Sequence, residues 1–308
     1  MKAFVLGASG SMGVAIVKEL HKRGIATVAA ARNEDQLTTL FSNLDVETKS
    51  CDAFLLNELQ DCAQGCTHLF MALNIPYGNW RTGLPILFSN IIETARKENL
   101  SLILVDNIYC YGEQKEALLT EETPMRPSTK KGKIRVDMIN RLHEAEVPYL
   151  IAHFPDFYGP HAYNTVLHLT LEKIAKNKRA QYVGDPALAR EFIYTPDGAE
   201  ALVHLALSPK CYNQHWNIPG AGTITGHDII EIARKSFSYE RSVATINRRM
   251  LSLAGLFSSQ LREVKELFYL YEKPHILSGS KYEREIGPLP KTPYEKGIAE
   301  TLKSLASR

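Results

Sequence analysis

The sequence is short of cysteine and of long apolar runs, and each shortage excludes a class of protein. It holds five cysteines among 308 residues, an odd number without paired ligand spacing, so we expect neither a disulfide framework nor a metal site. No apolar run approaches the roughly 20 residues that a membrane-spanning helix needs. The chain does not open with a basic and apolar leader segment. We therefore expect a cytoplasmic protein that binds no metal and has no membrane partner.

The sequence also lacks a large excess of either positive or negative charge. The 36 Lys and Arg residues nearly balance the 34 Asp and Glu residues, which leaves a net charge of +2. Such a balance gives no bulk attraction to nucleic acid, so we expect no nucleic-acid partner. The length fits one large domain or two coupled domains.

Three glycines at a spacing of three stand near the start of the chain. Gly7, Gly10 and Gly13 follow an apolar run at residues 3–6, which predicts a buried strand, and precede an amphipathic helix at residues 14–20. In this context Gly7 permits a tight turn, Gly10 lets the backbone approach a pyrophosphate, and Gly13 lets helix and strand pack closely. The helix start then offers free N–H groups to an anion. The pattern predicts a dinucleotide site; the alternative is a purely structural glycine turn.

The second expected strand, residues 27–31, ends at Arg32. Folds that prefer NAD place Asp or Glu here to bind the ribose 2′-hydroxyl. A guanidinium instead suits a 2′-phosphate through charge-assisted hydrogen bonds. Arg32 therefore favours NADP, with NAD still open, and the alternative is a solvated Arg beside the helix N-cap Asn33.

Further segments at residues 46–50, 68–73, 100–106 and 149–152 predict strands that alternate with helices. This alternation indicates an α/β fold with a doubly wound parallel sheet, a Rossmann fold. In such a sheet, ligands bind at the carboxyl ends of the strands.

The glycine spacing resembles that of the short-chain dehydrogenase/reductase superfamily. Segments 105–112, 152–160, 190–199 and 280–298 resemble motifs of its extended, epimerase/dehydratase-like branch, so the resemblance covers essentially the whole chain. It implies a dinucleotide-binding Rossmann domain at 1–160 and a smaller, mostly substrate-binding domain at 161–308, with the 190–207 segment returning to the Rossmann core. It also implies that Trp216 and Asn217 form a substrate-domain strand, and it leaves a homodimer open, since helices flanking the sheet often pair in this family.

The resemblance also implies which residues bind the cofactor. Asp52, after the third strand, corresponds to an Asp that touches the adenine amino group; its alternative role is a helix N-cap. The fourth strand ends near the cofactor. The expected cofactor contacts are Gly7, Ser9, Gly10, Ser11, Met12, Gly13, Arg32, Asp52, Ala72, Leu73 and Phe154.

The catalytic motifs depart from the family. Asn107 stands where the resemblance expects Ser or Thr, and an amide can still donate to a substrate oxygen. Lys131 and Arg135 stand where it expects Tyr-x-x-x-Lys on a helix that begins near Lys130. Lys131 is a candidate acid/base whose pKa neighbouring cations would lower; the alternative is a solvated basic helix start. Arg135 would supply that repulsion or hold an anionic substrate group.

Other polar side chains compete for the catalytic and substrate-binding roles. Tyr109 or Tyr111 could reach the nicotinamide, or be packed aromatic residues. His161 is expected to face the substrate, whereas His153 fits a structural, hydrogen-bonded histidine better. Arg190 corresponds to an Arg that contacts a substrate phosphate in nucleotide-sugar enzymes of this branch, and could equally cap the sheet through a salt bridge.

Together these features predict an NADP-dependent oxidoreductase or isomerase of the epimerase/dehydratase type. The substrate would be a small polar or anionic carbonyl or alcohol compound, bound by a pocket of positive character. The alternative is a non-catalytic NAD(P)-binding regulator, because the aligned Tyr, Ser and Lys are all replaced.

Overall fold

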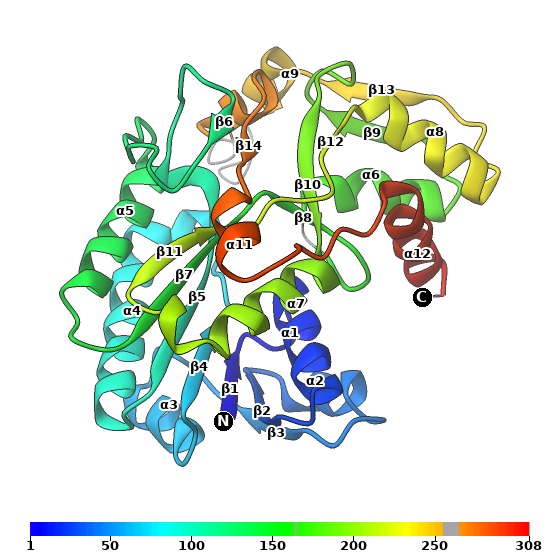
Figure 1. Cartoon of the computed structure of the whole chain (residues 1–308). Coiled ribbons are helices and arrows are strands. Elements are labelled where there is room, and N and C mark those ends of the chain that lie inside the picture. Colours follow the sequence, from blue (N-terminus) through cyan, green and yellow to red (C-terminus); the bar gives the residue numbers. More distant parts are fainter. Residues whose placement is uncertain (164, 255–264, 308) are drawn as a thin grey trace.

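The computed structural model describes residues 1–163, 165–254 and 265–307. Its centre is a seven-stranded parallel sheet with helices on both faces (Figure 1). The strand order is β11-β7-β5-β4-β1-β2-β3, which reverses direction at β1 and is typical of a doubly wound sheet. The strands are β1 (Lys2–Leu6), β2 (Ala26–Ala31), β3 (Glu47–Ser50), β4 (His68–Met71), β5 (Ser101–Asn107), β7 (Tyr149–Phe154) and β11 (Gln214–Asn217).

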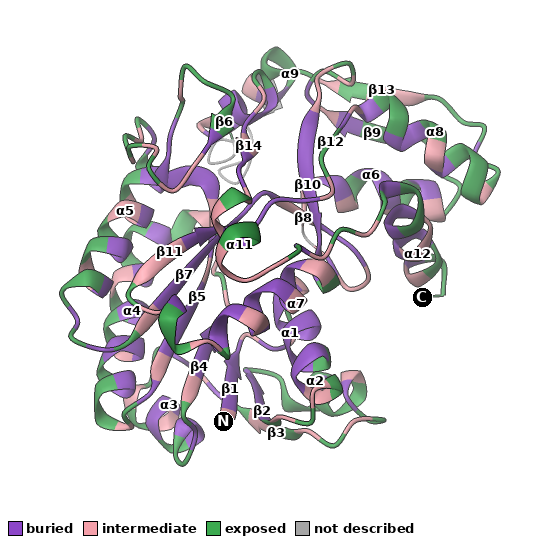
Figure 2. Ribbon diagram, in the orientation of Figure 1, coloured by how far each residue is buried: buried purple, intermediate pink, exposed green. Residues whose placement is uncertain are grey.

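Alternate residues of the strands enter two separate cores. In β1, Phe4 and Leu6 pack with the helices of one face, whereas Ala3 and Val5 pack with those of the other, because successive strand side chains point to opposite faces. The first face carries α3 (Leu56–Ala63), α4 (Trp80–Lys97) and α5 (Lys130–His143), and the second α1 (Ser11–Lys22), α2 (Glu34–Leu40) and α7 (Thr195–Ala206). The purple strands between mixed purple and green helices show this layering (Figure 2). The predicted doubly wound α/β fold is confirmed.

The rest of the chain forms a smaller unit above the carboxyl ends of the sheet (Figure 1). Three helices, α6, α8 and α12, pack together around a third core. The elements are β8 (Asp156–Tyr158), β10 (Arg190–Tyr194) and β12 (Thr223–Ile224) in one sheet, the pairs β9 (Ala180–Val183) with β13 (Val243–Ile246) and β6 (Leu118–Leu119) with β14 (Ile276–Leu277), and the helices α6 (Val166–Ala175), α8 (Gly226–Phe237), α9 (Arg248–Ala254), α11 (Ser280–Glu285) and α12 (Tyr294–Ala306). Short 3-10 helices are η1 (Tyr77–Asn79), η2 (Ile108–Cys110), η3 (Pro209–Cys211) and η4 (Phe268–Tyr271).

One sequence-based assignment is corrected by the sheet. Trp216 and Asn217, expected in a substrate-domain strand, belong to β11 at the edge of the main sheet, where they pair with Ala152 and His153. Trp216 is fully buried in the core beneath α7. A short strand carries no signal for which sheet it joins, and only the pairing with β7 decides it.

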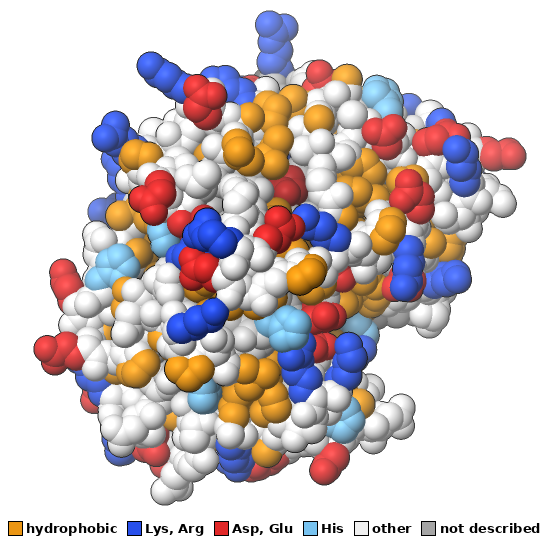
Figure 3. Space-filling model, viewed as in Figure 1, with side chains coloured by type: hydrophobic (Ala, Val, Ile, Leu, Met, Phe, Trp, Pro, Cys, Tyr) orange, Lys and Arg blue, Asp and Glu red, His pale blue; other side chains and the backbone are white. Residues whose placement is uncertain are grey.

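Within the described ranges, no helix is both long and apolar enough to cross a membrane. On the face shown in Figure 3, acidic and basic side chains are interspersed, in line with the small net charge.

Candidate functional site

The turn after β1 requires glycine at two positions. Gly7 has φ +85°, and a Cβ there would lie 2.6 Å from the backbone of Leu73. A Cβ on Gly13 would lie 2.1 Å from the carbonyl oxygen of Gly7. Gly10 is the N-cap of α1 and has no side chain to cap the helix, so the first N–H groups of α1 remain available to a ligand.

A cleft of about 250 Å³ opens at this turn, along the carboxyl ends of β1, β2 and β4. It reaches from the glycines to Arg32 and Asp52, which is where a pyrophosphate and an adenosine would lie in a dinucleotide fold. Its lining includes most of the expected cofactor contacts: Gly7, Ser9, Gly10, Arg32, Asp52, Ala72 and Leu73, with Asn33, Asn74 and Ile75 beside them. The shape and the glycine cradle fit a dinucleotide.

Four expected cofactor contacts do not line this cleft, namely Ser11, Met12, Gly13 and Phe154. Gly13 is packed against the backbone of Gly7 and Ala8. Met12 and Phe154 are buried together beneath α7, where both border Gly198. Ser11 donates from Oγ to the carbonyl oxygen of Tyr163 at 3.3 Å. These residues pack around the start of α1. Their contact with a cofactor stays a prediction.

The two polar residues at the adenosine end have different surroundings. Arg32 is exposed, and within the described residues its guanidinium makes no ion pair. The Oδ1 atom of Asp52 accepts from the backbone N–H of Phe54 at 3.0 Å, and α3 begins only at Leu56. Asp52 therefore holds a tight turn and is not the helix N-cap considered from the sequence.

Asn107 ends β5 and caps the following turn. Its Oδ1 accepts from the backbone N–H of Tyr109 at 3.0 Å, which starts η2. The amide NH₂ remains the group with which Asn107 can donate to a substrate oxygen.

Next to Asn107 lies a pair of phenols, of which Tyr109 is buried and Tyr77 is half-buried. The hydroxyl groups of Tyr109 and Tyr77 are 2.9 Å apart, and Tyr77 lies in η1, directly after the cleft residues that follow β4. Burial, with Tyr77 and Asp156 nearby, raises the pKa of Tyr109 well above its ordinary value. Burial also raises the pKa of Tyr77. Both phenols therefore keep their protons at neutral pH.

Lys131 lies beside these phenols at the start of α5. It is almost fully buried, not solvated, and its Nζ is 5.1 Å from the ring centre of Tyr77. The same Nζ donates to the carboxylate of Glu266 at 2.9 Å. This contact occupies the Lys131 amine with a carboxylate, which does not match the role of neutral base that we expected for it.

Arg135 and Tyr111 point away from the cleft. The guanidinium of Arg135 lies 3.2 Å from Asp106 Oδ1 and stacks over the ring of Trp80 at 4.4 Å. Tyr111 is fully buried and donates to Asn217 Oδ1 at 2.7 Å. Each is held by partners inside the protein, and the expected catalytic roles of both residues stay predictions.

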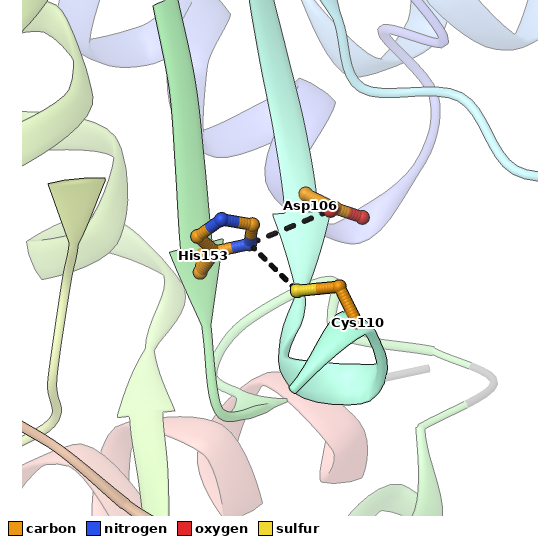
Figure 4. A group of neighbouring side chains, drawn as sticks. All are labelled: Asp106, Cys110 and His153. Atoms are coloured by element: carbon orange, nitrogen blue, oxygen red, sulfur yellow. Dashed lines mark hydrogen bonds and ion pairs between the residues drawn. The ribbon is translucent and has the colours of Figure 1, made fainter. Parts of the chain in front are cut away.

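Asp106, Cys110 and His153 meet beneath η2 (Figure 4). Nδ1 of His153 is 3.4 Å from Asp106 Oδ2 and 3.7 Å from Cys110 Sγ, and its Nε2 is 3.4 Å from Nδ1 of His215. Burial alone lowers the pKa of His153, but Cys110 and Asp106 outweigh it and raise that pKa to about 10. Burial and the neighbouring His153 lower the pKa of His215 to about 4. His153 is fully buried among these partners, and the structural role that its sequence context favours stays a prediction.

The two residues expected to bind substrate also have protein partners. Arg190 is buried and ion-paired with Asp156 at 2.6 Å, between the rings of Phe192 and Tyr271. The salt bridge that we considered as its alternative role is therefore present. His161 has φ +63° and lies against α1, with Nε2 3.4 Å from Nζ of Lys18. The expected strongly positive pocket is thus largely neutralised.

Sequence reasoning missed Tyr77, Asp156 and Glu266. Tyr77 follows the fourth strand closely, and a polar aromatic residue at a strand end was the available signal. Asp156 lies within the motif-like segment 152–160, but no local pattern indicates its ion pair with Arg190. Glu266 lies 135 residues from Lys131, and no local pattern indicates so distant a partner.

This geometry defines a dinucleotide-binding Rossmann protein with a second unit over the strand ends. A family model for the NAD dependent epimerase/dehydratase family matches residues 3–218. The chain belongs to this family. The comparison with curated proteins found no match.

Solved structures share the fold at low sequence identity. The UDP-glucuronic acid 4-epimerase of Bacillus cereus, in complex with NAD, has a TM-score of 0.81 at 17% identity over 100% of this chain and 99% of its own. The UDP-glucose 4-epimerase of Thermotoga maritima, with UDP-glucose, has a TM-score of 0.80 at 16% identity over 100% and 99%. The dTDP-glucose 4,6-dehydratase of Bacillus anthracis, in complex with NAD, has a TM-score of 0.81 at 15% identity over 100% and 97%.

Proposed function

We propose that the protein is an NADP-dependent oxidoreductase or isomerase of the epimerase/dehydratase type that acts on a small polar carbonyl or alcohol compound. The observation that carries the proposal is the glycine turn, where Gly7 and Gly13 leave no room for a Cβ beside an open cleft. Membership of an enzyme family supports a catalytic protein.

Gly7, Gly10 and the start of α1 would hold the pyrophosphate, and Asp52 would face the adenine. Arg32 supports NADP, since its guanidinium lies at the cleft wall without an ion-pair partner among the described residues. The related structures that contain NAD make NAD the competing choice. When bound, the nicotinamide supplies or accepts a hydride.

The chain must then supply a proton. We assign this role to Tyr109, whose raised pKa keeps the phenol protonated at neutral pH, so that it holds a proton to donate. Tyr77 can pass a proton through the 2.9 Å contact between the hydroxyl groups. The Lys131 ammonium beside Tyr77 stabilises any negative charge that develops on the phenols, and the NH₂ group of Asn107 would orient a substrate oxygen.

Two relatives act on or bind UDP-sugars by their descriptions. In this chain Arg190 is paired with Asp156, so little positive charge remains for a substrate phosphate. We therefore favour a polar but uncharged substrate over an anionic one.

The alternative, a non-catalytic NAD(P)-binding regulator, is favoured by one observation. Lys131 stands at the helix position where the family places its catalytic Tyr. Its ammonium is held in an ion pair with Glu266. Transfer of deuterium from ring-labelled NADPH to a carbonyl compound in a substrate panel would establish catalysis. Tight NADPH binding with no transfer across the panel would favour the regulator.

Cofactor choice is tested by calorimetry on Arg32→Asp. Loss of charge-assisted hydrogen bonds should weaken NADPH binding about 10- to 100-fold, while NADH binding changes little. Arg234→Asp on α8 makes the same charge change outside the cleft and should leave both affinities unchanged. An equal loss for NADPH and NADH in Arg32→Asp would remove the basis for the NADP assignment.

A further inference from the structure

The cluster of Asp106, Cys110 and His153 has no part in the proposed chemistry (Figure 4). The three side chains come from the end of β5, from η2 and from the end of β7, and all three are buried. Their potential ligand atoms lie within 4.8 Å of one another. A group of Cys, His and Asp in this arrangement is a candidate for metal binding.

Hydrogen bonds alone do not satisfy this cluster. Nδ1 of His153 faces three acceptors, namely Asp106 Oδ2 at 3.4 Å, Cys110 Sγ at 3.7 Å and the carbonyl oxygen of Asn107 at 3.3 Å. One ring nitrogen carries one hydrogen at most. Neither carboxylate oxygen of Asp106 accepts a well-formed hydrogen bond from the described residues. Oδ1 has the guanidinium of Arg135 at 3.2 Å, whereas Oδ2 has only His153 at 3.4 Å, so Oδ2 is the oxygen that can take a further partner such as an ion.

We propose that Asp106, Cys110, His153 and the carbonyl oxygen of Asn107 bind a zinc ion. The thiolate, imidazole and carboxylate donors are the set that zinc takes in proteins. The Asn107 oxygen lies 3.9 Å from Cys110 Sγ. Nδ1 of His153 is 3.3–3.7 Å from the other three donor atoms, and such spacings are compatible with a tetrahedral site whose centre is roughly 2.0–2.3 Å from each donor, close to the usual zinc bond lengths.

The charges around the cluster are compatible with a divalent cation. Zinc would displace the thiol proton of Cys110 and the Nδ1 proton of His153, so its two positive charges replace two protons. Arg135 approaches Oδ1 of Asp106 at 3.2 Å, which leaves Oδ2 for the metal. The guanidinium then remains an ion-pair partner of the ligating carboxylate and does not compete for the same oxygen.

A second layer of contacts supports the imidazole. His153 Nε2 lies 3.4 Å from Nδ1 of His215, so its N–H can donate there and leave Nδ1 free for the metal. Ligating histidines usually donate their other N–H in this way, which fixes the ring orientation. All four coordination positions come from the protein, which is typical of a structural site. The ion would join β5 to β7 directly beneath η2, the turn that carries Tyr109.

The test is the metal content of the untagged, full-length protein from zinc-supplemented cells. Mass spectrometry of the desalted protein should find about one zinc ion per chain. Cys110→Ala and His153→Ala should lose it, whereas Cys211→Ala, which removes another buried free thiol, should retain it. His215→Ala should weaken zinc affinity about 10- to 100-fold.

Wild-type protein gives an independent measurement if a variant fails to fold. After chelation, titration with Co²⁺ should produce a thiolate-to-cobalt charge-transfer band, and Zn²⁺ should raise the melting temperature. Wild-type protein that carries no zinc and shows neither response would overturn the proposal. Retention of zinc by folded Cys110→Ala would also overturn it, since the ion would then be bound elsewhere.

Discussion

At the scale of single residues, two cations on one face of α5 are each paired with a carboxylate. Lys131 and Arg135 are buried, whereas Lys130 and Lys133 are exposed. The i, i+4 spacing puts the buried pair on the same side of the helix. The ion pairs with Glu266 and Asp106 offset the electrostatic cost of burying these two cations. The run of cations therefore divides into two solvated residues and two buried, ion-paired residues. Composition alone does not distinguish them.

The role of Tyr109 is tested by removing its hydroxyl group. Tyr109→Phe should lower turnover about 10²- to 10⁴-fold, the usual contribution of a general acid, while NADPH binding is unchanged. The measurement is NADPH oxidation with the best carbonyl compound of the substrate panel. Tyr239→Phe removes another buried hydroxyl, which bonds Lys178 and Ala180, and should keep full turnover. Equal turnover in Tyr109→Phe and wild type would exclude the phenol as the proton donor.

At the scale of elements, the turn between β1 and α1 determines cofactor binding. Gly13→Val should abolish dinucleotide binding, because its Cβ would lie 2.1 Å from the carbonyl oxygen of Gly7 and push α1 off the strand. Gly24→Asn is the control: its φ of +67° suits Asn, and a Cβ there meets no atom within 4 Å. Calorimetry with NADPH on both folded variants checks the prediction. Unchanged affinity in Gly13→Val would rule this cleft out as the cofactor site.

Elements with strong periodicity could be predicted from sequence, and their partners could not. The strand before Gly7, the helix after it and the start of α5 after Thr129 all follow local patterns, and Thr129 indeed caps α5 through the N–H of Gly132. The environment of Lys131 depends on Glu266, which lies in a turn shortly before η4 and is distant in sequence. Long-range ion pairs leave no spacing signal, so the sequence identified the right helix face but assigned it the wrong electrostatic surroundings.

The same limit applies to the buried cluster beneath η2. Cys110 and His153 are 43 residues apart, and zinc motifs are recognised in sequences by close pairs of ligands. The ligands meet only because β5 and β7 are neighbours in the sheet. Strand order, and not ligand spacing, brings them together.

At the scale of the whole molecule, Glu191 connects three separate parts of the chain. It lies on β10, is buried, and accepts from the backbone N–H groups of Gly220 at 3.2 Å and Leu277 at 2.9 Å. Gly220 follows the last strand of the main sheet, and Leu277 lies in β14. Burial raises the pKa of Glu191 to about 7 although both N–H groups oppose the shift. The junction between the main sheet and the upper unit is therefore sensitive to pH near neutrality.

The sign of this sensitivity follows from the protons bound in each state. An unfolded Glu titrates near pH 4.3, so between that pH and about 7 the folded chain holds a proton on Glu191 that the unfolded chain has lost. Its contribution to the free energy of unfolding is complete below the unfolded pKa and disappears as the pH rises through the folded pKa. The loss between pH 5 and pH 8 should be about 2–3 kcal/mol.

Urea unfolding of wild type and Glu191→Gln across this pH range checks the prediction. Glu191→Gln cannot titrate, and its amide oxygen still accepts a hydrogen bond from one of the two N–H groups. Its free energy of unfolding should therefore not show the decrease that deprotonation of Glu191 causes in the wild type. The difference in unfolding free energy between wild type and Glu191→Gln should therefore shrink steadily from pH 5 to pH 8. Glu93→Gln on the exposed face of α4 should follow the wild-type curve. Parallel curves for wild type and Glu191→Gln would show that Glu191 titrates as it does in the unfolded chain, and the junction would then owe its pH response to other groups.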